Sequence, residues 1–319
     1  MVSKNKKMLR NNHMAVLKEK TFMEKFSDSK YLFLLIAPTI IYFILFHYLP
    51  LWGILISLQD YSAFKGFWDS PWVGFKHFSL FFSHPGFFRL IRNTFLLSFY
   101  TLLWDFPAPI IFALTLNEVN SLRVKKFVQT VSYIPHFIST VVVVGMVTMF
   151  LSPSRGVINV VLENIGYDKV NFMADARYFR TIYVVSDVWQ GMGWGAIVYL
   201  AALSNIDPAL YEAAIIDGAN KFKRIIHITL PCIAPTIITL FLLRTGRLLS
   251  VGFEKVYLIQ KPITYETSDV INTYVFRQGL VSGNFSYASA VGLFNSVANL
   301  LFLIISNYLS KRYSETSLW

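Results

Sequence analysis

The sequence predicts an all-α polytopic membrane protein, and three observations support that prediction. Hydrophobic residues make up 55% of the 319-residue chain and charged residues only 15%, whereas soluble domains carry roughly 25% charged residues. Several apolar segments approach the length of about 20 residues that a helix needs to cross a bilayer. Lysine and arginine, which produce a net charge of +11, are densest in alternate connections between those segments, as expected for a membrane protein.

The chain begins with a polar, basic stretch, residues 1–30, which lacks the apolar core of a cleavable signal peptide. We expect it to be a cytoplasmic tail, because basic residues beside a membrane segment are attracted to the anionic inner leaflet. A nucleic-acid-binding arm is the alternative interpretation. The bilayer explains the charge more simply, so membrane lipids are expected partners and nucleic acid is not.

Six segments are expected to span the membrane and to form a transmembrane domain over residues 31–308. The prolines of the first and second segments suggest kinks, which spanning helices tolerate when neighbours satisfy the freed carbonyl groups. The alternative, six buried helices of a soluble core, is hard to reconcile with so many runs of membrane length. The segments are 31–58, 93–116, 127–150, 181–203, 231–252 and 287–308.

The orientation follows from the distribution of lysine and arginine. With the N-terminus in the cytoplasm, the connections on the inner side hold these residues at roughly twice the density of those on the outer side, the expected bias. This orientation places the loop 204–230 in the cytoplasm. It also places there the C-terminal tail, residues 309–319.

A short helix is expected inside the loop 204–230. Asp207-Pro208 is a strong helix start, and Gly218 is a natural helix end. A helix over 208–218 is about 15 Å long, too short to span a membrane, so we expect it to lie along the surface. Its alanines keep it thin enough to enter a groove on a partner, and Glu212 could accept a charge-assisted hydrogen bond there. An ordinary loop helix with a solvated acidic face is an equally good interpretation of these residues alone.

The spacing of residues across this loop resembles the EAA motif of permease subunits in binding-protein-dependent ABC importers. The motif is met by Glu212, Ala213, Ala214, Gly218, Ile228, Leu230 and Pro231, and the form Asp217-Gly218-Ala219 resembles the carbohydrate branch, relatives of the maltose permease. Further stretches resemble the lipoprotein-associated oligo- and polysaccharide permease subfamily: NTFLLS at 93–98, FPAPIIFALTLNE at 106–118, SYIPHFIST at 132–140, LSPSRGVIN at 151–159, SDVWQGMGWGAIVYLAAL at 186–203 and NFSYASAVGLFNSVANL at 284–300.

The resemblance implies a type I ABC importer permease fold with a cytoplasmic coupling helix, in the cell membrane of a prokaryote. It implies four partners: a second, non-identical permease subunit, an ATPase homodimer, an extracytoplasmic sugar-binding lipoprotein and an oligosaccharide substrate. The chain has no Gly-rich phosphate loop, so ATP and Mg²⁺ belong to the partner ATPase, and this chain is expected to bind no cofactor and to be no enzyme. The residues expected to couple to the ATPase are Glu212, Ala213, Ala214, Asp217, Gly218, Ala219, Leu230 and Pro231.

Four ionisable residues fall within the expected spans, where charges are costly and often functional. Counted at 1.5 Å per residue, Asp187 and Arg247 lie at a similar depth, roughly 8–9 Å from the outer end. We therefore expect these two to pair, with Arg244 near the substrate pathway or in contact with Asp105. A structural role in holding neighbouring helices together is the alternative to contact with sugar hydroxyls or a uronate carboxylate.

Two tryptophans in the fourth segment, Trp189 and Trp194, are candidates to line the pathway, because sugars stack on aromatic rings. Helix packing around Gly191 and Gly193 is at least as good an explanation. The single cysteine, Cys232, excludes an internal disulfide, and the six histidines show no metal-binding spacing. Two other classes remain as alternatives, a polytopic enzyme of glycan processing and a stand-alone secondary transporter or channel.

Overall fold

The computed structural model describes residues 30–313 and Ser317. Within them the protein is helical, and the extended pairing is limited to isolated bridges such as Gln59 with Trp72. The chain divides into two compact units, Met1–Leu55 and Ile56–Trp319. The expected N-terminal tail lies outside the described residues apart from Lys30, and the C-terminal tail lies partly outside them, so both boundaries stay predictions.

The described part of the first unit is one apolar helical segment. Helix α3 (Lys30–Phe43) continues through a π-helical turn (Ile44–Tyr48) into a 3-10 helix (Leu49–Leu58). The segment is apolar on every face, yet no side chain of α3 is buried by the rest of the protein. A helix of that kind belongs in lipid or against another protein, and its extent matches the expected first span, 31–58.

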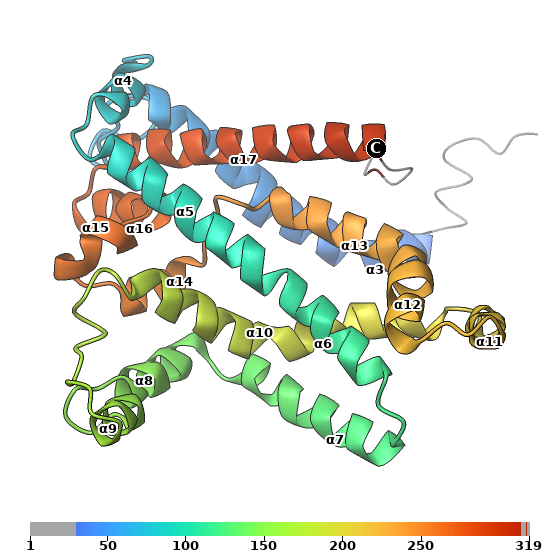
Figure 1. Ribbon diagram of the computed structural model, residues 1–319. Coiled ribbons are helices and arrows are strands. Elements are labelled where there is room, and N and C mark those ends of the chain that lie inside the picture. The colour runs from blue at the N-terminus through green and yellow to red at the C-terminus, as the bar shows by residue number, and fades with distance from the viewer. Residues whose placement is uncertain (1–29, 314–316, 318–319) are drawn as a thin grey trace, which may run out of the picture. The chain divides into compact units, whose positions relative to one another are not determined.

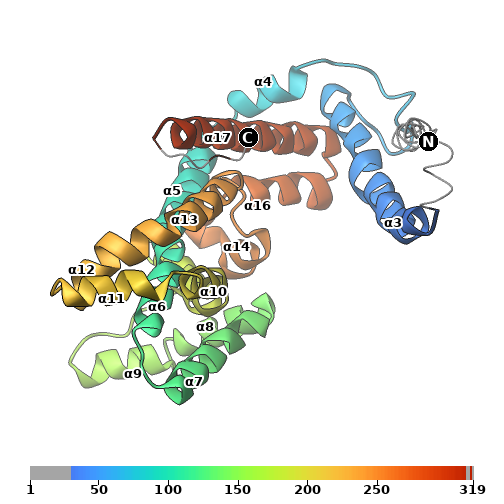
Figure 2. The same cartoon turned by 90° about the vertical axis from the view of Figure 1, so that its right-hand side faces the viewer.

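The second unit contains the other helices, which Figure 1 and Figure 2 show from two sides. Their bounds are α4 (Lys76–Phe82), α5 (Phe87–Asp105), α6 (Pro107–Asn117), α7 (Leu122–Tyr133), α8 (Thr140–Phe150), α9 (Val157–Asn164), α10 (Phe179–Ser204), α11 (Pro208–Ile216), α12 (Lys221–Arg224), α13 (Leu230–Thr245), α14 (Phe253–Ile259), α15 (Tyr265–Ser268), α16 (Ile271–Phe276) and α17 (Phe285–Tyr313). Short 3-10 turns lie at Ile134–Phe137 and Pro262–Thr264, and π-helical turns at Ile225–Thr229 and Arg277–Val281.

The described residues contain 4 helical segments that are long and apolar enough to cross a membrane, or 5 if the bent pair α7 and α8 is one span. The four are Lys30–Leu58, Phe87–Asn117, Lys221–Thr245 and Phe285–Arg312. The remaining expected span, 181–203, coincides with α10, which has 26 residues but lacks the apolar composition of the others. The count of six spans therefore stays a prediction, while their helical character is confirmed.

The expected third span, 127–150, is wrong as a single helix. The chain bends by 100° between Leu122–Phe137 and Thr140–Phe150. Pro135 cannot donate the hydrogen bond that a continuing helix needs, and Ile138 and Ser139 adopt extended backbone conformations. Together these residues end one helix and allow a new one to start in another direction.

The expected fifth span, 231–252, is also displaced. Its helix ends at Thr245, where Gly246 is the C-cap, and residues 246–249 form turns. At its other end the helix starts earlier, at Lys221, because a π-helical turn joins α12 to α13 without a break. Arg247 therefore lies in a turn rather than within a spanning helix.

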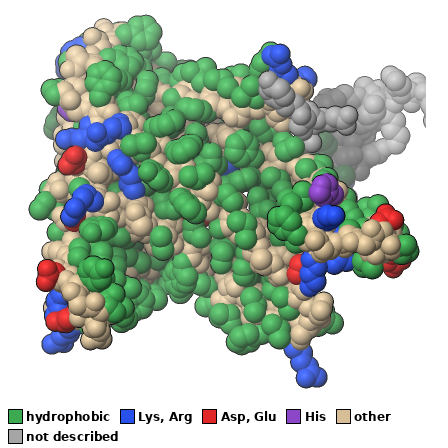
Figure 3. All heavy atoms as spheres, viewed as in Figure 1, with side chains coloured by type: hydrophobic (Ala, Val, Ile, Leu, Met, Phe, Trp, Pro, Cys, Tyr) green, Lys and Arg blue, Asp and Glu red, His purple; other side chains and the backbone are tan. Residues whose placement is uncertain are grey.

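Helix α10 is the centre of the second unit and packs against α5, α6, α7 and α13. Two of its glycines allow this close packing: a Cβ atom at Gly193 would lie 2.1 Å from the carbonyl oxygen of Ser132, and one at Gly195 would lie 2.9 Å from Pro109. The interpretation that glycines in this segment allow helices to pack closely is confirmed at Gly193. Figure 3 shows apolar side chains over most of the visible face and charged side chains gathered near its two ends, as a bilayer requires.

Candidate functional site

The second unit encloses a cavity of about 830 Å³ between α5, α6, α10 and α13. This volume lies within the range of about 300–1,000 Å³ that is typical of ligand pockets. Polar and charged side chains gather on its wall, although the surrounding helices are apolar. Five residues that the sequence singled out for the pathway line it, namely Asp105, Asp187, Trp194, Arg244 and Arg247.

Asp105 and Arg244 form an ion pair across this cavity. Arg244, near the end of α13, donates from Nη2 to Oδ2 of Asp105, the last residue of α5, at 2.5 Å. The side chain of Asp105 is 14% exposed and that of Arg244 is 45% exposed, so the pair is open to the cavity on the arginine side. The expected contact between these two residues is confirmed.

The expected pairing of Asp187 with Arg247 is wrong. Asp187 instead accepts from Nζ of Lys255 at 3.0 Å, and the same ammonium group donates to Gln190 at 3.2 Å. Lys255 belongs to α14, which follows α13 and packs against α10, and its side chain is only 5% exposed. Arg247 has no carboxylate partner within the described residues.

An apolar cluster forms part of the cavity wall. Tyr183 and Val251 line the cavity and also belong to a buried cluster with Leu97 and Val256. The hydroxyl of Tyr183 accepts a hydrogen bond from the backbone N–H of Gly252 at 3.2 Å. This bond fixes the segment after α13 against α10 and completes the wall.

The two tryptophans of α10 face different surroundings. Trp194 lines the cavity and is 44% exposed, with its ring stacked on His136 at 4.6 Å between centroids. Trp189 lines a separate, almost wholly apolar pocket of about 420 Å³ between α8, α9 and α10. Only Trp194 is therefore placed to meet a molecule inside the polar cavity.

Helix α11 has the short surface form that the sequence predicts for 208–218. The side chain of Asp207 accepts from the N–H of Ala209 at 2.9 Å and caps the first turn. Gly218 follows the helix with φ +74°, a left-handed conformation that glycine adopts without strain. No side chain of α11 is buried, and in Figure 1 the helix projects from one end of the second unit.

The residues around Gly218 connect α11 firmly to the next helix. The N–H of Ala219 donates to the carbonyl of Ala214 at 2.8 Å, and Asn220 caps α12 by accepting from Lys223 at 2.9 Å. Leu230 and Pro231 then lie inside the continuous helix Lys221–Thr245. The motif residues thus form one connected path from α11 into α13, while Glu212 is exposed.

A hydrogen bond between Tyr211 and Thr229 connects α11 to the start of α13. The hydroxyl groups lie 3.0 Å apart, and Thr229 is 3% exposed. Replacing Tyr211 with phenylalanine removes this bond, a loss of about 1 kcal/mol, without removing the ring. In the importer that the resemblance of the sequence implies, we expect substrate-stimulated ATPase activity to fall severalfold while assembly is retained; unchanged stimulation would contradict a coupling role for Tyr211.

The helical fold, the polar cavity and the projecting surface helix define a membrane transport component. The chain belongs to the family described as binding-protein-dependent transport system inner membrane component, whose model matches residues 105–315. It is accordingly a multi-pass permease subunit with the type I permease fold. It contributes to transport and has no ATPase site of its own.

Individual relatives cover almost the whole chain. Protein LplB of Bacillus subtilis (strain 168) is 44% identical over 299 residues, 94% of both chains. The polygalacturonan/rhamnogalacturonan transport system permease protein YteP of the same strain is 43% identical over 302 residues, 95% of this chain and 94% of the other. A chain in the crystal structure of a bacterial alginate ABC transporter, in complex with an alginate pentasaccharide-bound periplasmic protein, matches with a TM-score of 0.86 and 43% identity, covering 94% of this chain and 100% of that one.

Sequence reasoning missed two cavity residues, His136 and Tyr183, and the ion-pair partner Lys255. The charge count places Lys255 in a connection outside the membrane, although it stands beside Val256 in a mainly apolar run that could have marked it as buried. The structure places His136 in the cavity wall, whereas a ring nitrogen of His227 lies 3.0 Å from the carbonyl oxygen of Lys223.

Proposed function

We propose that this chain is the permease subunit of an ATP-driven importer for acidic oligosaccharides, which pass through the cavity of about 830 Å³. The observation that supports an acidic substrate is the unpaired charge of Arg247. Arg244 neutralises Asp105, and Lys255 neutralises Asp187. Among the described residues this leaves Arg247 as a cavity cation without a carboxylate partner, and its side chain is exposed.

The chemistry of a guanidinium group fits this role. Its planar fork binds a carboxylate through two parallel hydrogen bonds, which a neutral sugar hydroxyl cannot match. Trp194 adds an aromatic ring that suits the apolar face of a sugar. The names of the relatives support an acidic substrate, because one solved importer takes up the acidic polysaccharide alginate and the permease YteP is named for polygalacturonan, a polymer of uronic acid.

The exposed surface of α11 supports the energy source and the ATPase partner in this proposal. Its apolar side chains are exposed, with Ile216 86% and Ile215 56% accessible, so the helix has the surface of an element that a partner covers. We assign that partner as an ATPase homodimer in the cytoplasm, which holds ATP and Mg²⁺ and receives α11 in a cleft. A second, non-identical permease completes the pathway, and an extracytoplasmic lipoprotein delivers the oligosaccharide.

This arrangement distinguishes the proposal from the two other classes considered from the sequence. Neither the family nor the relatives support a glycan-processing enzyme or a stand-alone transporter. The coupling residues from Glu212 to Pro231 act mechanically in this proposal, by carrying movement from the ATPase to α13. An assembled importer that takes up its sugar without ATP would contradict it.

Replacing Arg247 with glutamine tests the acidic class directly. In the complete importer, supplied with its binding protein in proteoliposomes, we expect the KM for a uronate oligosaccharide to rise about tenfold, as expected for one charge-assisted hydrogen bond. Uptake of the carboxyl-reduced analogue should not change. Arg123→Gln, which removes an exposed arginine of α7, is the matched control, and equal effects of Arg247→Gln on both sugars would overturn the proposal.

A further inference from the structure

We propose that Arg92 and Arg180 form an outer anion-binding site, which receives a carboxylate of the oligosaccharide before the sugar reaches the cavity. The inference rests on the proposed function and adds a second site to it. Arg92 belongs to the second turn of α5 and Arg180 to the first turn of α10. The N-terminal ends of these two helices lie at the end of the second unit that is remote from α11 (Figure 1). In the proposed orientation this end faces the binding protein.

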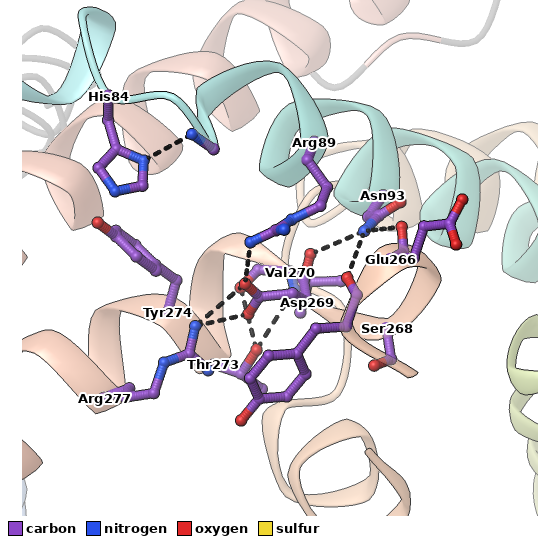
Figure 4. Close-up of polar contacts among 12 residues, drawn as sticks. His84, Arg89, Asn93, Glu266, Ser268, Asp269, Val270, Thr273, Tyr274 and Arg277 are labelled. Carbon is purple, nitrogen blue, oxygen red and sulfur yellow. Dashed lines mark hydrogen bonds and ion pairs between the residues drawn. The ribbon is translucent and has the colours of Figure 1, made fainter. Parts of the chain in front are cut away.

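A neighbouring carboxylate, Asp269, is already neutralised and does not use these two arginines. It is 1% exposed and accepts two hydrogen bonds from Arg277, at 2.8 and 3.0 Å. Arg89 also donates to Oδ2 of this carboxylate, at 3.5 Å. Figure 4 shows the guanidinium groups of Arg277 and Arg89 directed at this one carboxylate. The negative charge of Asp269 is therefore paired without Arg92 or Arg180.

Arg92 and Arg180 instead donate to neutral oxygen atoms around the same loop. Nη2 of Arg180 donates to the amide oxygen of Asn93 at 3.1 Å, and Nη2 of Arg92 donates to the carbonyl of Glu266 at 3.2 Å. Asn93 is itself fixed, because its amide nitrogen donates to the carbonyls of Glu266 at 2.9 Å and Asp269 at 3.2 Å (Figure 4). The two guanidinium groups are thus held in place by Asn93 of α5 and by the carbonyl of Glu266, and neither of these groups neutralises them.

Their remaining capacity is large. A guanidinium group has five N–H donors, and in the part of the chain that the structure describes the hydrogen bonds of Arg92 and Arg180 use Nη2 alone. Arg180 lies within electrostatic range of Arg92 and of Glu266. The carboxylate of Glu266 is exposed and, among the described residues, forms no ion pair with either arginine. The two positive charges of Arg92 and Arg180 therefore exceed the single negative charge near them. The pair therefore has unused donors and excess positive charge.

The position of Arg180 connects this pair to the cavity. It precedes Tyr183 by three residues and Asp187 by seven, so all three lie on one face of α10, and the latter two line the cavity. Seven helical residues correspond to about 10 Å. Tyr183 lies between Arg180 and Asp187 along α10 and belongs to a buried apolar cluster, so a carboxylate held by Arg180 would have to pass this cluster to reach the cavity.

The test is uptake by the complete importer in proteoliposomes with the variants Arg92→Gln and Arg180→Gln. We expect each to raise the KM for a uronate oligosaccharide roughly tenfold, to leave the carboxyl-reduced analogue unchanged and to weaken the salt dependence of KM. Arg92 is exposed, so its removal tests the site even if Arg180→Gln fails to assemble. Arg180→Lys should recover part of the acidic preference, and Arg155→Gln, an exposed arginine between α8 and α9, should behave as wild type.

Other results would each overturn the outer site. If Arg247→Gln removes the acidic preference while both outer variants retain it, the outer site is wrong and the proposed function stands. If wild type shows no preference for the acidic sugar over its reduced analogue, both proposals are wrong. If the defects of the outer variants affect both sugars equally and depend on the phosphatidylglycerol content of the vesicles, the ligand is a lipid phosphate rather than the substrate.

Discussion

Gly218→Val is expected to abolish uptake and to leave ATP hydrolysis unresponsive to substrate. Gly218 has φ +74°, and a Cβ atom there would meet nothing within 4 Å, so the cost of the change lies in the backbone and not in a clash. A β-branched residue in a left-handed conformation is a true outlier, and relieving it requires the turn between α11 and α12 to change. The measurement is substrate uptake together with ATPase activity in proteoliposomes.

Two further variants isolate the turn as the cause. Gly218→Asn should keep most activity, because asparagine tolerates the left-handed conformation better than other residues. Gly166→Val makes the same change at a glycine with φ +88° and equally open surroundings, beyond the end of α9, and should remain coupled. Normal coupling in Gly218→Val would contradict the role assigned to this turn.

The second large effect is expected from Lys255→Met, which removes the partner of Asp187. Breaking a buried ion pair costs about 3–5 kcal/mol, because the remaining charge is uncompensated. The side chain of Asp187 is 29% exposed and keeps some solvation, so we expect about 3 kcal/mol, the lower end of that range. Thermal unfolding of the purified complex measures the loss, and uptake should fall with it, since Asp187 lines the cavity and Lys255 also donates to Gln190 of α10.

The double variant Asp187→Asn/Lys255→Met shows whether the loss comes from an unpaired charge. We expect it to recover most of the stability that Lys255→Met loses, because it leaves no isolated charge. Lys261→Met, at an exposed lysine just after α14, is the control for the change of residue type. If the double variant is as unstable as the single one, packing around Lys255 rather than its charge stabilises this region.

The sequence predicted the local features of the fold well, because they depend on nearby residues. Asp207 and Gly218 define α11 through a cap and a backbone conformation that need no tertiary contact. The 100° bend after Phe137 was missed, since an apolar run shows length but not direction. The early end of α13 was missed for a similar reason: Leu248, Leu249 and Val251 continue the apolar pattern after the helix has ended.

The errors at the site have the same origin. The depth of Arg247 was calculated for a straight helix up to residue 252, so the end at Thr245 removed the basis for pairing it with Asp187. The partner Lys255 becomes available only because the chain turns back after α13, which no local pattern reveals. Trp189, by contrast, could have been separated from Trp194 beforehand, because five residues correspond to about 140° around a helix.

The unbroken helix Lys221–Thr245 has a mechanical consequence. Its 25 residues form a lever about 37 Å long, with α11 attached near one end and Arg244 near the other. A tilt of about 10° around the attached end would displace Arg244 by roughly 6 Å, given that length. That distance exceeds the 2.5 Å contact with Asp105, so a tilt of this size would be enough to break the ion pair.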